Sequence, residues 1–88
     1  MFGGHQTGQV SVDNTSGGTL IVASRAARGA VTVINHGTTD VYVGRTGLTT
    51  GTGALLVGVK GAIITVDSQD AIYGIAGSAQ TVSYIEVY

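Results

Sequence analysis

Apolar and polar residues alternate along most of this 88-residue chain with a period of two, which is the spacing of side chains on the two faces of a β-strand. The alternating stretches are rich in valine, isoleucine and threonine, and clusters of glycine, asparagine, aspartate and serine separate them. The alanine-rich segment 24–28 is too short for more than one turn of helix. The pattern predicts seven strands, at 9–13, 19–23, 30–35, 40–44, 62–67, 71–76 and 80–88.

Short strands spaced about ten residues apart, with glycine at the turns, are typical of an antiparallel sandwich or a small barrel. We predict an all-β fold, a small antiparallel β-sandwich of jelly-roll type with about seven strands. Residues 9–88 form a single domain in this interpretation, and residues 1–8 form an N-terminal arm. Segment 48–58 leaves two alternatives open, a loop throughout or a loop followed by a short edge strand at 55–57.

The alternation places apolar side chains on both faces of several strands. In strand 19–23, Leu20 and Val22 are expected to point away from Ile21. One face of such a strand fills the domain's own core, and the other must be covered by a loop or by another chain. The pattern therefore predicts contact with other protein chains.

The closing strand has the same two-sided character. Val82, Tyr84, Glu86 and Tyr88 share one face, and the residues between them share the other. Tyrosine is common at protein interfaces because it combines a large apolar ring with a polar tip. We expect Tyr84 and Tyr88 to lie at an interface between protomers.

Composition strengthens the case for an assembled protein. Charged residues make up 10% of the chain, against about 25% in ordinary soluble domains, and hydrophobic residues make up 43%. We therefore expect a homo-oligomer. The net charge of −1 and the scattered basic residues argue against a nucleic-acid partner. The start of the chain lacks a secretion signal, and no apolar run reaches 18 residues, so we expect no membrane partner.

Residues with catalytic or metal-binding potential are scattered. His5 and His36 lack the spacing of metal ligands, and the chain has no cysteine. Ser24, His36 and Asp40 supply the residue types of a catalytic triad, but no strained turn frames the serine. The glycine-rich segment 44–53 lacks the Gly-Lys-Ser/Thr ending of a phosphate-binding loop. We expect no cofactor, no metal and no enzymatic activity.

Three polar residues are assigned structural roles. Arg25 and Arg28 precede a predicted strand in a chain with few charges, so each is expected to pair with a carboxylate or to bond loop carbonyls. The candidate carboxylates are Asp13, Asp40 and Glu86. Asn35 begins the turn Asn35-His36-Gly37 and is assigned to its structure.

The order of several segments resembles small accessory virion proteins of tailed bacteriophages. The shared pattern is an arginine, a strand ending in Ile-Asn, a Val-Tyr-Val-Gly strand, a glycine-rich loop, an Ile-Tyr strand and a terminal strand with a glutamate. The matching segments are 28–44, 53–58, 70–76 and 82–87. The resemblance implies a non-enzymatic β-sandwich on the virion, most simply a head decoration (cement) protein.

This hypothesis favours a trimer as the homo-oligomer and sets expectations for partners and contacts. The partner is the major capsid protein or another virion protein, and the location is the head surface after synthesis in the host cytoplasm. Loop 44–58 and the N-terminal arm are expected to supply the contacts, through Phe2, His5, Gln6, Leu48 and Leu55. The alternative is a carbohydrate- or receptor-binding module of a head fibre or tail appendage, which requires exposed tyrosines such as Tyr42 and Tyr73.

Overall fold

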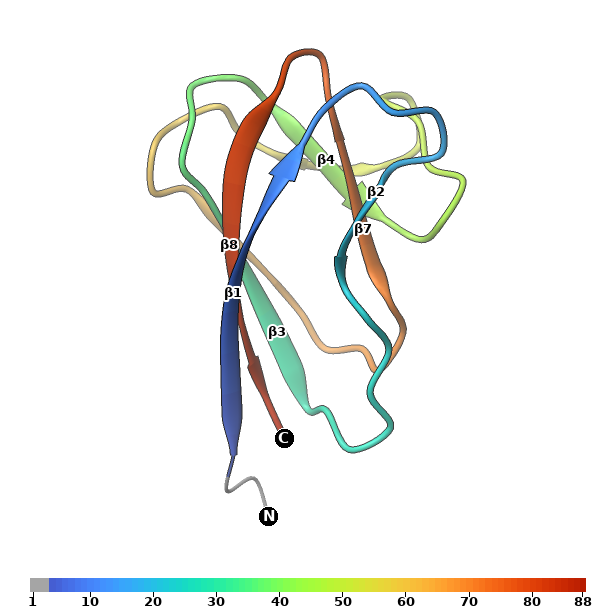
Figure 1. Ribbon diagram of the computed structural model, residues 1–88, viewed down its shortest axis with the longest axis vertical. Helices are drawn as coiled ribbons and strands as arrows, with labels where there is room; N and C mark the ends of the chain where they lie inside the picture. Colours follow the sequence, from blue (N-terminus) through green and yellow to red (C-terminus); the bar gives the residue numbers. More distant parts are fainter. Residues whose placement is uncertain (1–3) are drawn as a thin grey trace.

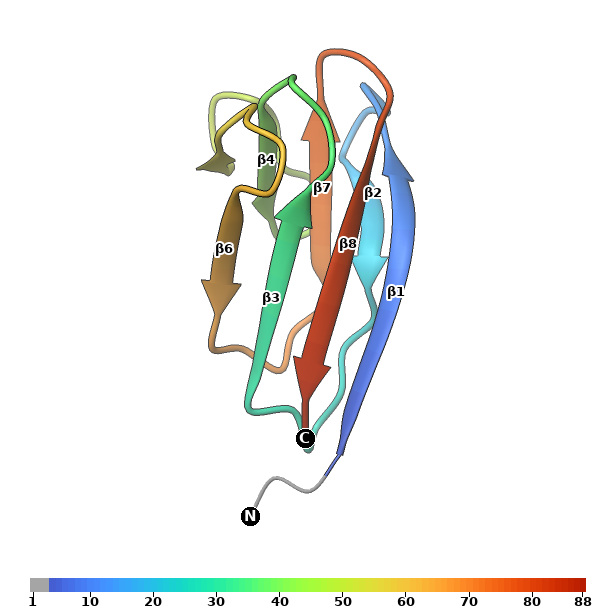
Figure 2. The same cartoon turned by 90° about the vertical axis from the view of Figure 1, so that its left-hand side faces the viewer.

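The computed structural model describes residues 4–88, which form two four-stranded antiparallel sheets packed face to face (Figures 1 and 2). Eight strands build the two sheets, one more than the sequence pattern predicts. In chain order they are β1 (His5–Val12), β2 (Thr19–Val22), β3 (Ala30–Asn35), β4 (Val41–Gly44), β5 (Ala54–Leu56), β6 (Ile63–Val66), β7 (Ile72–Ala76) and β8 (Gln80–Val87). The all-β sandwich expected from the sequence is confirmed.

The strand order is that of a jelly roll. One sheet has the order β1-β8-β3-β6 and the other β2-β7-β4-β5. The first strand therefore pairs with the last, the second with the seventh, the third with the sixth and the fourth with the fifth, as in a long hairpin rolled into a sandwich. Strands β1 and β2 lie at one margin of the sandwich, and β5 and β6 lie at the opposite margin (Figure 2).

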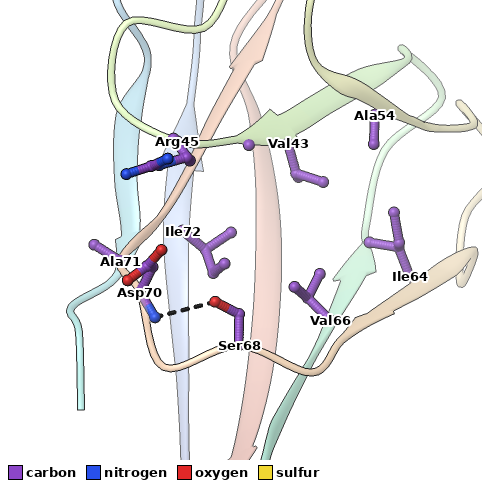
Figure 3. Close-up of a pocket in the computed structure, with 10 residues that line it drawn as sticks. Val43, Arg45, Ala54, Ile64, Val66, Ser68, Asp70, Ala71 and Ile72 are labelled. Carbon is purple, nitrogen blue, oxygen red and sulfur yellow. Dashed lines mark hydrogen bonds between the residues drawn. The ribbon is translucent and has the colours of Figure 1, made fainter. Parts of the chain in front are cut away.

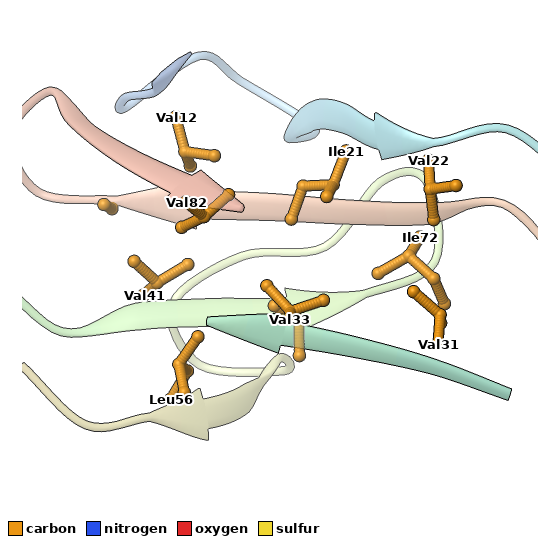
Figure 4. Packing of buried hydrophobic residues seen from close by; sticks show 11 residues of the cluster. Val12, Ile21, Val22, Val31, Val33, Val41, Leu56, Ile72 and Val82 are labelled. Carbon is orange, nitrogen blue, oxygen red and sulfur yellow. The ribbon is translucent and has the colours of Figure 1, made fainter. Parts of the chain in front are cut away.

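Valine and isoleucine from both sheets fill the space between them (Figure 4). These β-branched side chains suit a strand, and the period of two directs alternate ones inward. In β3, for example, Val31 and Val33 are fully buried, whereas Thr32 and Ile34 are half-buried on the other face. The cluster consists of Val12, Ile21, Val22, Val31, Val33, Val41, Val43, Leu56, Ile72, Ala76 and Val82.

The structure corrects the expected side-chain directions in β2. The pairing of β2 with β7 shifts register between Leu20 and Val22, which marks a β-bulge. Because the bulge adds a residue, Ile21 and Val22 both enter the core, and Leu20 is left exposed. A strict period of two cannot anticipate this change.

Strand β1 begins at His5, four residues before the predicted start at Gln9. Residues 5–8 pair with β8 in unbroken register, from His5 opposite Val87 to Gly8 opposite Tyr84. They therefore extend the sheet and are not part of a separate arm. Residues 5–8 contain no large apolar side chain, so the alternation pattern gives no sign of a strand there.

Segment 48–58 follows the second of the two alternatives left open by the sequence. It is a loop that leads into β5, which pairs with β4 at the edge of its sheet. In residues 4–88 there is no helix of the length and apolarity needed to cross a membrane.

Candidate interaction surfaces

Arg28 and Glu86 are the buried charged side chains of the described chain. Arg28 Nη1 donates to Glu86 Oε2 at 3.0 Å and to the carbonyl of Ala23 at 2.9 Å. Its Nε donates to the Ser68 carbonyl at 2.7 Å, and its Nη2 donates to the carbonyl of Asp70. One guanidinium thus ties the β2–β3 and β6–β7 connections to β8, and these donors are occupied within the fold.

Arg25 lies at the solvent-facing side of the same carboxylate. Its Nε donates to Glu86 Oε1 at 2.8 Å, and its Nη2 donates to Gln6 Oε1 at 2.8 Å. Its guanidinium also stacks over the ring of Tyr88, 4.1 Å from the ring centre. Of the three candidate carboxylates, Glu86 is therefore the one that pairs with both arginines.

Asn35 has the structural environment assigned to it. Its side chain is fully buried, and its Nδ2 donates to the carbonyls of Thr39 at 3.1 Å and Val57 at 3.2 Å. Its Oδ1 accepts from the backbone N–H of Gly37 at 2.9 Å. The amide closes the turn after β3 and fixes it to the segment that follows β5.

Of the two tyrosines expected at a protomer interface, Tyr84 lies on the inward face of β8 and Tyr88 directly follows that strand. Tyr84 is half-buried and packs against the core, and its ring lies over Gly8 of β1. A Cβ at Gly8 would lie 2.7 Å from Tyr84 Cζ, so the glycine makes room for the ring. Tyr88 lies over Gly4 in the same way. Each ring is thus placed by contacts within this chain.

Leu48 does not lie where a contact with another chain was expected, and that expectation is corrected. Its side chain is 5% exposed and packs against the outer face of the β2-β7-β4-β5 sheet, near Gly18, Gly44 and Gly53. Gly17 and Leu48 also form an isolated β-bridge, which holds the loop on that face. Leu55 is 54% exposed, and its side chain is available to a partner.

Exposed apolar side chains are concentrated in one short part of the chain. Four of the seven exposed large hydrophobic residues lie between positions 55 and 63, on β5, on β6 and in the connection between them. We call this group the β5–β6 surface, and it consists of Leu55, Val57, Val59 and Ile63. Their neighbours Leu56 and Ile64 face the core, so Leu55 and Ile63 lie on the outer faces of the two different sheets, and the group spans the margin between those faces. Leu55 was expected from the sequence as a contact residue, and Val57 lies within the expected contact loop 44–58. Val59 and Ile63 were not anticipated, although 55, 57 and 59 alternate with a period of two.

A mainly apolar cavity of about 270 Å³ opens beside this surface, between the two sheets (Figure 3). The side chains of Val43, Ile64 and Val66 line it, and Arg45 and Asp70 border it on one side. Because β5 has three residues, it covers only part of the space between the sheets at this margin. The cavity therefore exposes apolar side chains of the interior at the same margin, and its lining is separate from the four residues of the β5–β6 surface.

The residues with catalytic potential lie apart from one another and contact different partners. His36 Nε2 lies 2.9 Å from Ser83 Oγ, and Asp40 Oδ1 accepts from the backbone N–H of Gly58 at 2.6 Å. Ser24 borders a different hollow, together with Tyr73. Residues 4–88 contain no group of three or more histidine, cysteine, aspartate or glutamate residues placed to hold a metal ion.

The remaining expected contact residues lie near the start of the chain. His5 and Gln6 are exposed on β1, and Gln6 bonds Arg25 as described above. Phe2 lies outside the described residues.

No protein-family model matches this chain, and no curated protein matches it.

Proposed function

We propose that this protein is a non-enzymatic structural protein of a virion, and that it decorates and stabilises the assembled head of a tailed bacteriophage. In this proposal it binds the major capsid protein through the β5–β6 surface. Binding to the assembled shell in preference to the free subunits shifts the equilibrium toward the shell. The protein therefore acts as a cement.

The observation that carries the proposal is the β5–β6 surface itself. Val57, Val59 and Ile63 are 48%, 58% and 64% exposed in a chain with 10% charged residues. Exposed large apolar residues gathered at one margin of a protein mark sites where proteins meet, and aliphatic side chains at the centre of a contact are favourable once water is excluded. The open cavity beside the surface offers a recess for an apolar side chain of the partner.

Fold and sequence pattern lend further support. Jelly rolls occur in viral capsid proteins and in lectins, so the fold is compatible with a virion protein without establishing one. The resemblance to accessory virion proteins rests on segments that include β3, β4, β7 and β8. These segments supply the centre of each sheet.

The test is whether the protein stabilises phage shells through this surface. Shells assembled from the capsid protein of the same phage are mixed with the wild-type protein or with the double variant Leu55→Asp/Ile63→Asp, and binding is measured by co-sedimentation. We expect the double variant to bind at least tenfold more weakly, because burial of each side chain is worth on the order of 1 kcal/mol or more. Shells with the wild-type protein should also disassemble at a higher temperature.

The matched control adds the same two charges elsewhere. Ser16→Asp/Gln69→Asp changes two exposed residues outside both the β5–β6 surface and loop 44–58, and should bind like the wild type. Wild-type protein that fails to bind the shells would refute the proposal. Equal binding by both double variants would refute the role of the β5–β6 surface.

A second candidate function is carbohydrate binding on a fibre or tail appendage. A hollow of about 280 Å³ is lined by Tyr73 together with Ser24, Arg45 and Asp70, which are groups that can stack on a sugar ring and bond its hydroxyls. Tyr42 lies on the same outer face, on the neighbouring strand β4, and is half-buried. A glycan array in which a wild-type signal disappears in Tyr73→Ala would favour this function, and an array without signal would remove it.

A further inference from the structure

The edge of β1 exposes backbone groups in a regular pattern. Gly4 N donates to Tyr88 O at 2.8 Å, and Tyr88 N donates to Gly4 O at 2.9 Å, so these two residues form a mutually bonded pair. In an antiparallel ladder such pairs alternate with non-bonded pairs. Because the β1–β8 register is unbroken, the even-numbered residues of β1 direct their backbone groups to β8.

The odd-numbered residues therefore direct their N–H and C=O groups outward. These residues are His5, Thr7, Gln9 and Ser11. Strand β1 is the outermost strand of its sheet, and Figure 2 shows it at the margin with no strand beyond it. Within residues 4–88 no backbone hydrogen bond outside the sheet ladder reaches these four residues.

This edge lacks the features by which proteins usually prevent an edge strand from pairing. Such features are a very short strand, a bulge, a proline, a charged side chain or a covering loop. Strand β1 is eight residues long and pairs with β8 without a bulge, and residues 5–12 contain no proline, lysine, arginine, aspartate or glutamate. The edge from His5 to Ser11 is therefore open to another strand. The free edge ends there, because the carbonyl of Asp13 accepts from the backbone N–H of Ala76 in β7 at 2.9 Å.

We infer that the occupant of this edge is a second copy of the same chain, paired β1 to β1 in antiparallel orientation about a two-fold axis at Gly8. The outward-facing residues are placed symmetrically about Gly8, so the edge is complementary to its own reversed copy. Thr7 then forms a mutually bonded pair with Gln9 of the partner subunit, and His5 does so with Ser11 of the partner subunit. All four outward-facing residues are satisfied in this single register.

The side chains of β1 are compatible with this register. Gly8 meets Gly8 of the partner subunit at the axis, where two larger side chains would crowd each other. No like charges face each other, since the strand has no acidic or basic residue other than His5. The resulting assembly is a dimer with a sheet continuous across both copies, in place of the trimer favoured by the sequence analysis. The inference rests on the edge alone and does not require the proposed virion location.

The first test removes one outward-facing donor. Proline is tolerated on an edge strand where the N–H faces solvent, so Gln9→Pro should keep the fold while it blocks the pairing. We expect the wild type to sediment as a dimer and Gln9→Pro to weaken the dimer at least tenfold. Circular dichroism and thermal unfolding of both proteins check that the variant is folded.

The matched control lies on the other free edge of the same sheet. Asn35 N donates to Ala62 O at 2.9 Å, and with the β3–β6 register this places the backbone groups of Thr65 on the outer side of β6. Thr65→Pro therefore removes an equivalent edge donor and should leave the dimer intact. A monomeric wild type, a trimer, or a dimer equally strong in Gln9→Pro would overturn the inference and would leave the shell-binding test unaffected.

The second test determines the register between the two β1 strands by disulfide crosslinking. Mutually bonded pairs have Cα atoms about 5.5 Å apart, within the range that a disulfide spans. Thr7→Cys/Gln9→Cys should thus give a disulfide-linked dimer on mild oxidation, and the natural chain has no cysteine to interfere. His5→Cys/Thr7→Cys has the same spacing along the strand but is four residues out of register, and should stay uncrosslinked. The reverse result, or no crosslink in either variant, would overturn the register.

Discussion

The two margins of this sandwich differ in what they present to other molecules. The β1 margin is long, its exposed side chains are polar, and its free groups belong to the backbone. The β5–β6 margin is made of strands of three and four residues and exposes aliphatic side chains. Backbone groups require a partner strand in one register, whereas apolar side chains reward burial against any surface of fitting shape. One small domain thus presents two kinds of surface, one on which binding would be directional and one on which it would not.

The largest effect is expected where the fold connects the two margins. Arg28 ties the β6–β7 connection to β8, the strand that pairs with β1. Arg28→Ala should lower the free energy of unfolding by about 3–5 kcal/mol, because it removes one partner of a buried ion pair and leaves the carbonyls of Ala23, Ser68 and Asp70 without the guanidinium donor. Urea unfolding measures this loss.

Arg25→Ala is the comparison for that prediction, because Arg25 binds the same carboxylate from a partly exposed position. Its loss should cost about 1 kcal/mol, mainly through the ion pair and the stacking on Tyr88. Equal losses in the two variants would show that burial of the Arg28 pair does not set its importance.

A second expectation compares one glycine from each margin. At Gly58, beside the β5–β6 surface, a Cβ would lie 2.5 Å from the carbonyl oxygen of Thr38, and backbone cannot easily move away. At Gly8 a Cβ would meet the half-buried ring of Tyr84, which can shift. Gly58→Ala should therefore cost about 2–3 kcal/mol and Gly8→Ala about 1 kcal/mol. Thermal unfolding of the two variants orders them, and the opposite order would contradict this interpretation.

Salt concentration should have a smaller effect than these substitutions, and it tests the β1 margin. Residues 5–12 carry no acidic side chain, lysine or arginine, so screening has little to act on at the β1 edge. The dissociation constant of the proposed dimer should change less than about threefold between 0.05 and 0.5 M NaCl, measured by sedimentation equilibrium. A tenfold change would indicate an ionic contact at some other surface.

The smallest effect concerns the turn that follows β1. The backbone N–H of Thr15 donates to Asp13 Oδ1 at 3.0 Å, and the Thr15 hydroxyl donates to the same oxygen. These bonds, the hydroxyl first, lower the pKa of Asp13 below its ordinary value. A lowered pKa stabilises the fold above the ordinary pKa, and this contribution is lost as the pH falls through the pKa of the folded state.

Asp13→Ala should consequently be slightly less stable than the wild type at pH 7, and the difference should disappear in strong acid. Chemical unfolding of both proteins across the acidic range gives the comparison. Asp67→Ala, at an exposed aspartate in the β6–β7 connection, serves as the control. A difference that stays constant into strong acid would contradict the assignment.

Much of the fold follows from the sequence because β-branched residues at a period of two specify strands with one buried face. Val31 and Val33 illustrate this, since both are fully buried as their spacing requires. The N-terminal half of β1 could not be predicted in this way, because its pairing with β8 uses backbone groups and leaves no pattern of apolar side chains in the sequence. The bulge that turns Ile21 and Val22 inward could not be predicted either, because the alternation pattern assumes a constant period of two.

The contact residues were harder to anticipate than the strands. Leu48 is an isolated leucine in a glycine-rich loop, and whether such a residue faces a partner or the chain's own sheet depends on how the loop folds back. The structural roles of Arg28 and Asn35 were easier to predict, because a buried polar group in a small apolar core needs hydrogen-bond partners within the chain. The sequence thus identifies groups that must be satisfied more readily than surfaces that are left free.

The placement of the two margins on opposite sides of the sandwich has a consequence for avidity. In the proposed dimer, joining two copies at β1 leaves a β5–β6 surface at each far end, pointing away from the axis. Once one end is attached, the other searches a small volume, with an effective concentration on the order of millimolar where the spacing of the target sites fits. Weak attachment at each end would then suffice for a lasting bridge between neighbouring sites.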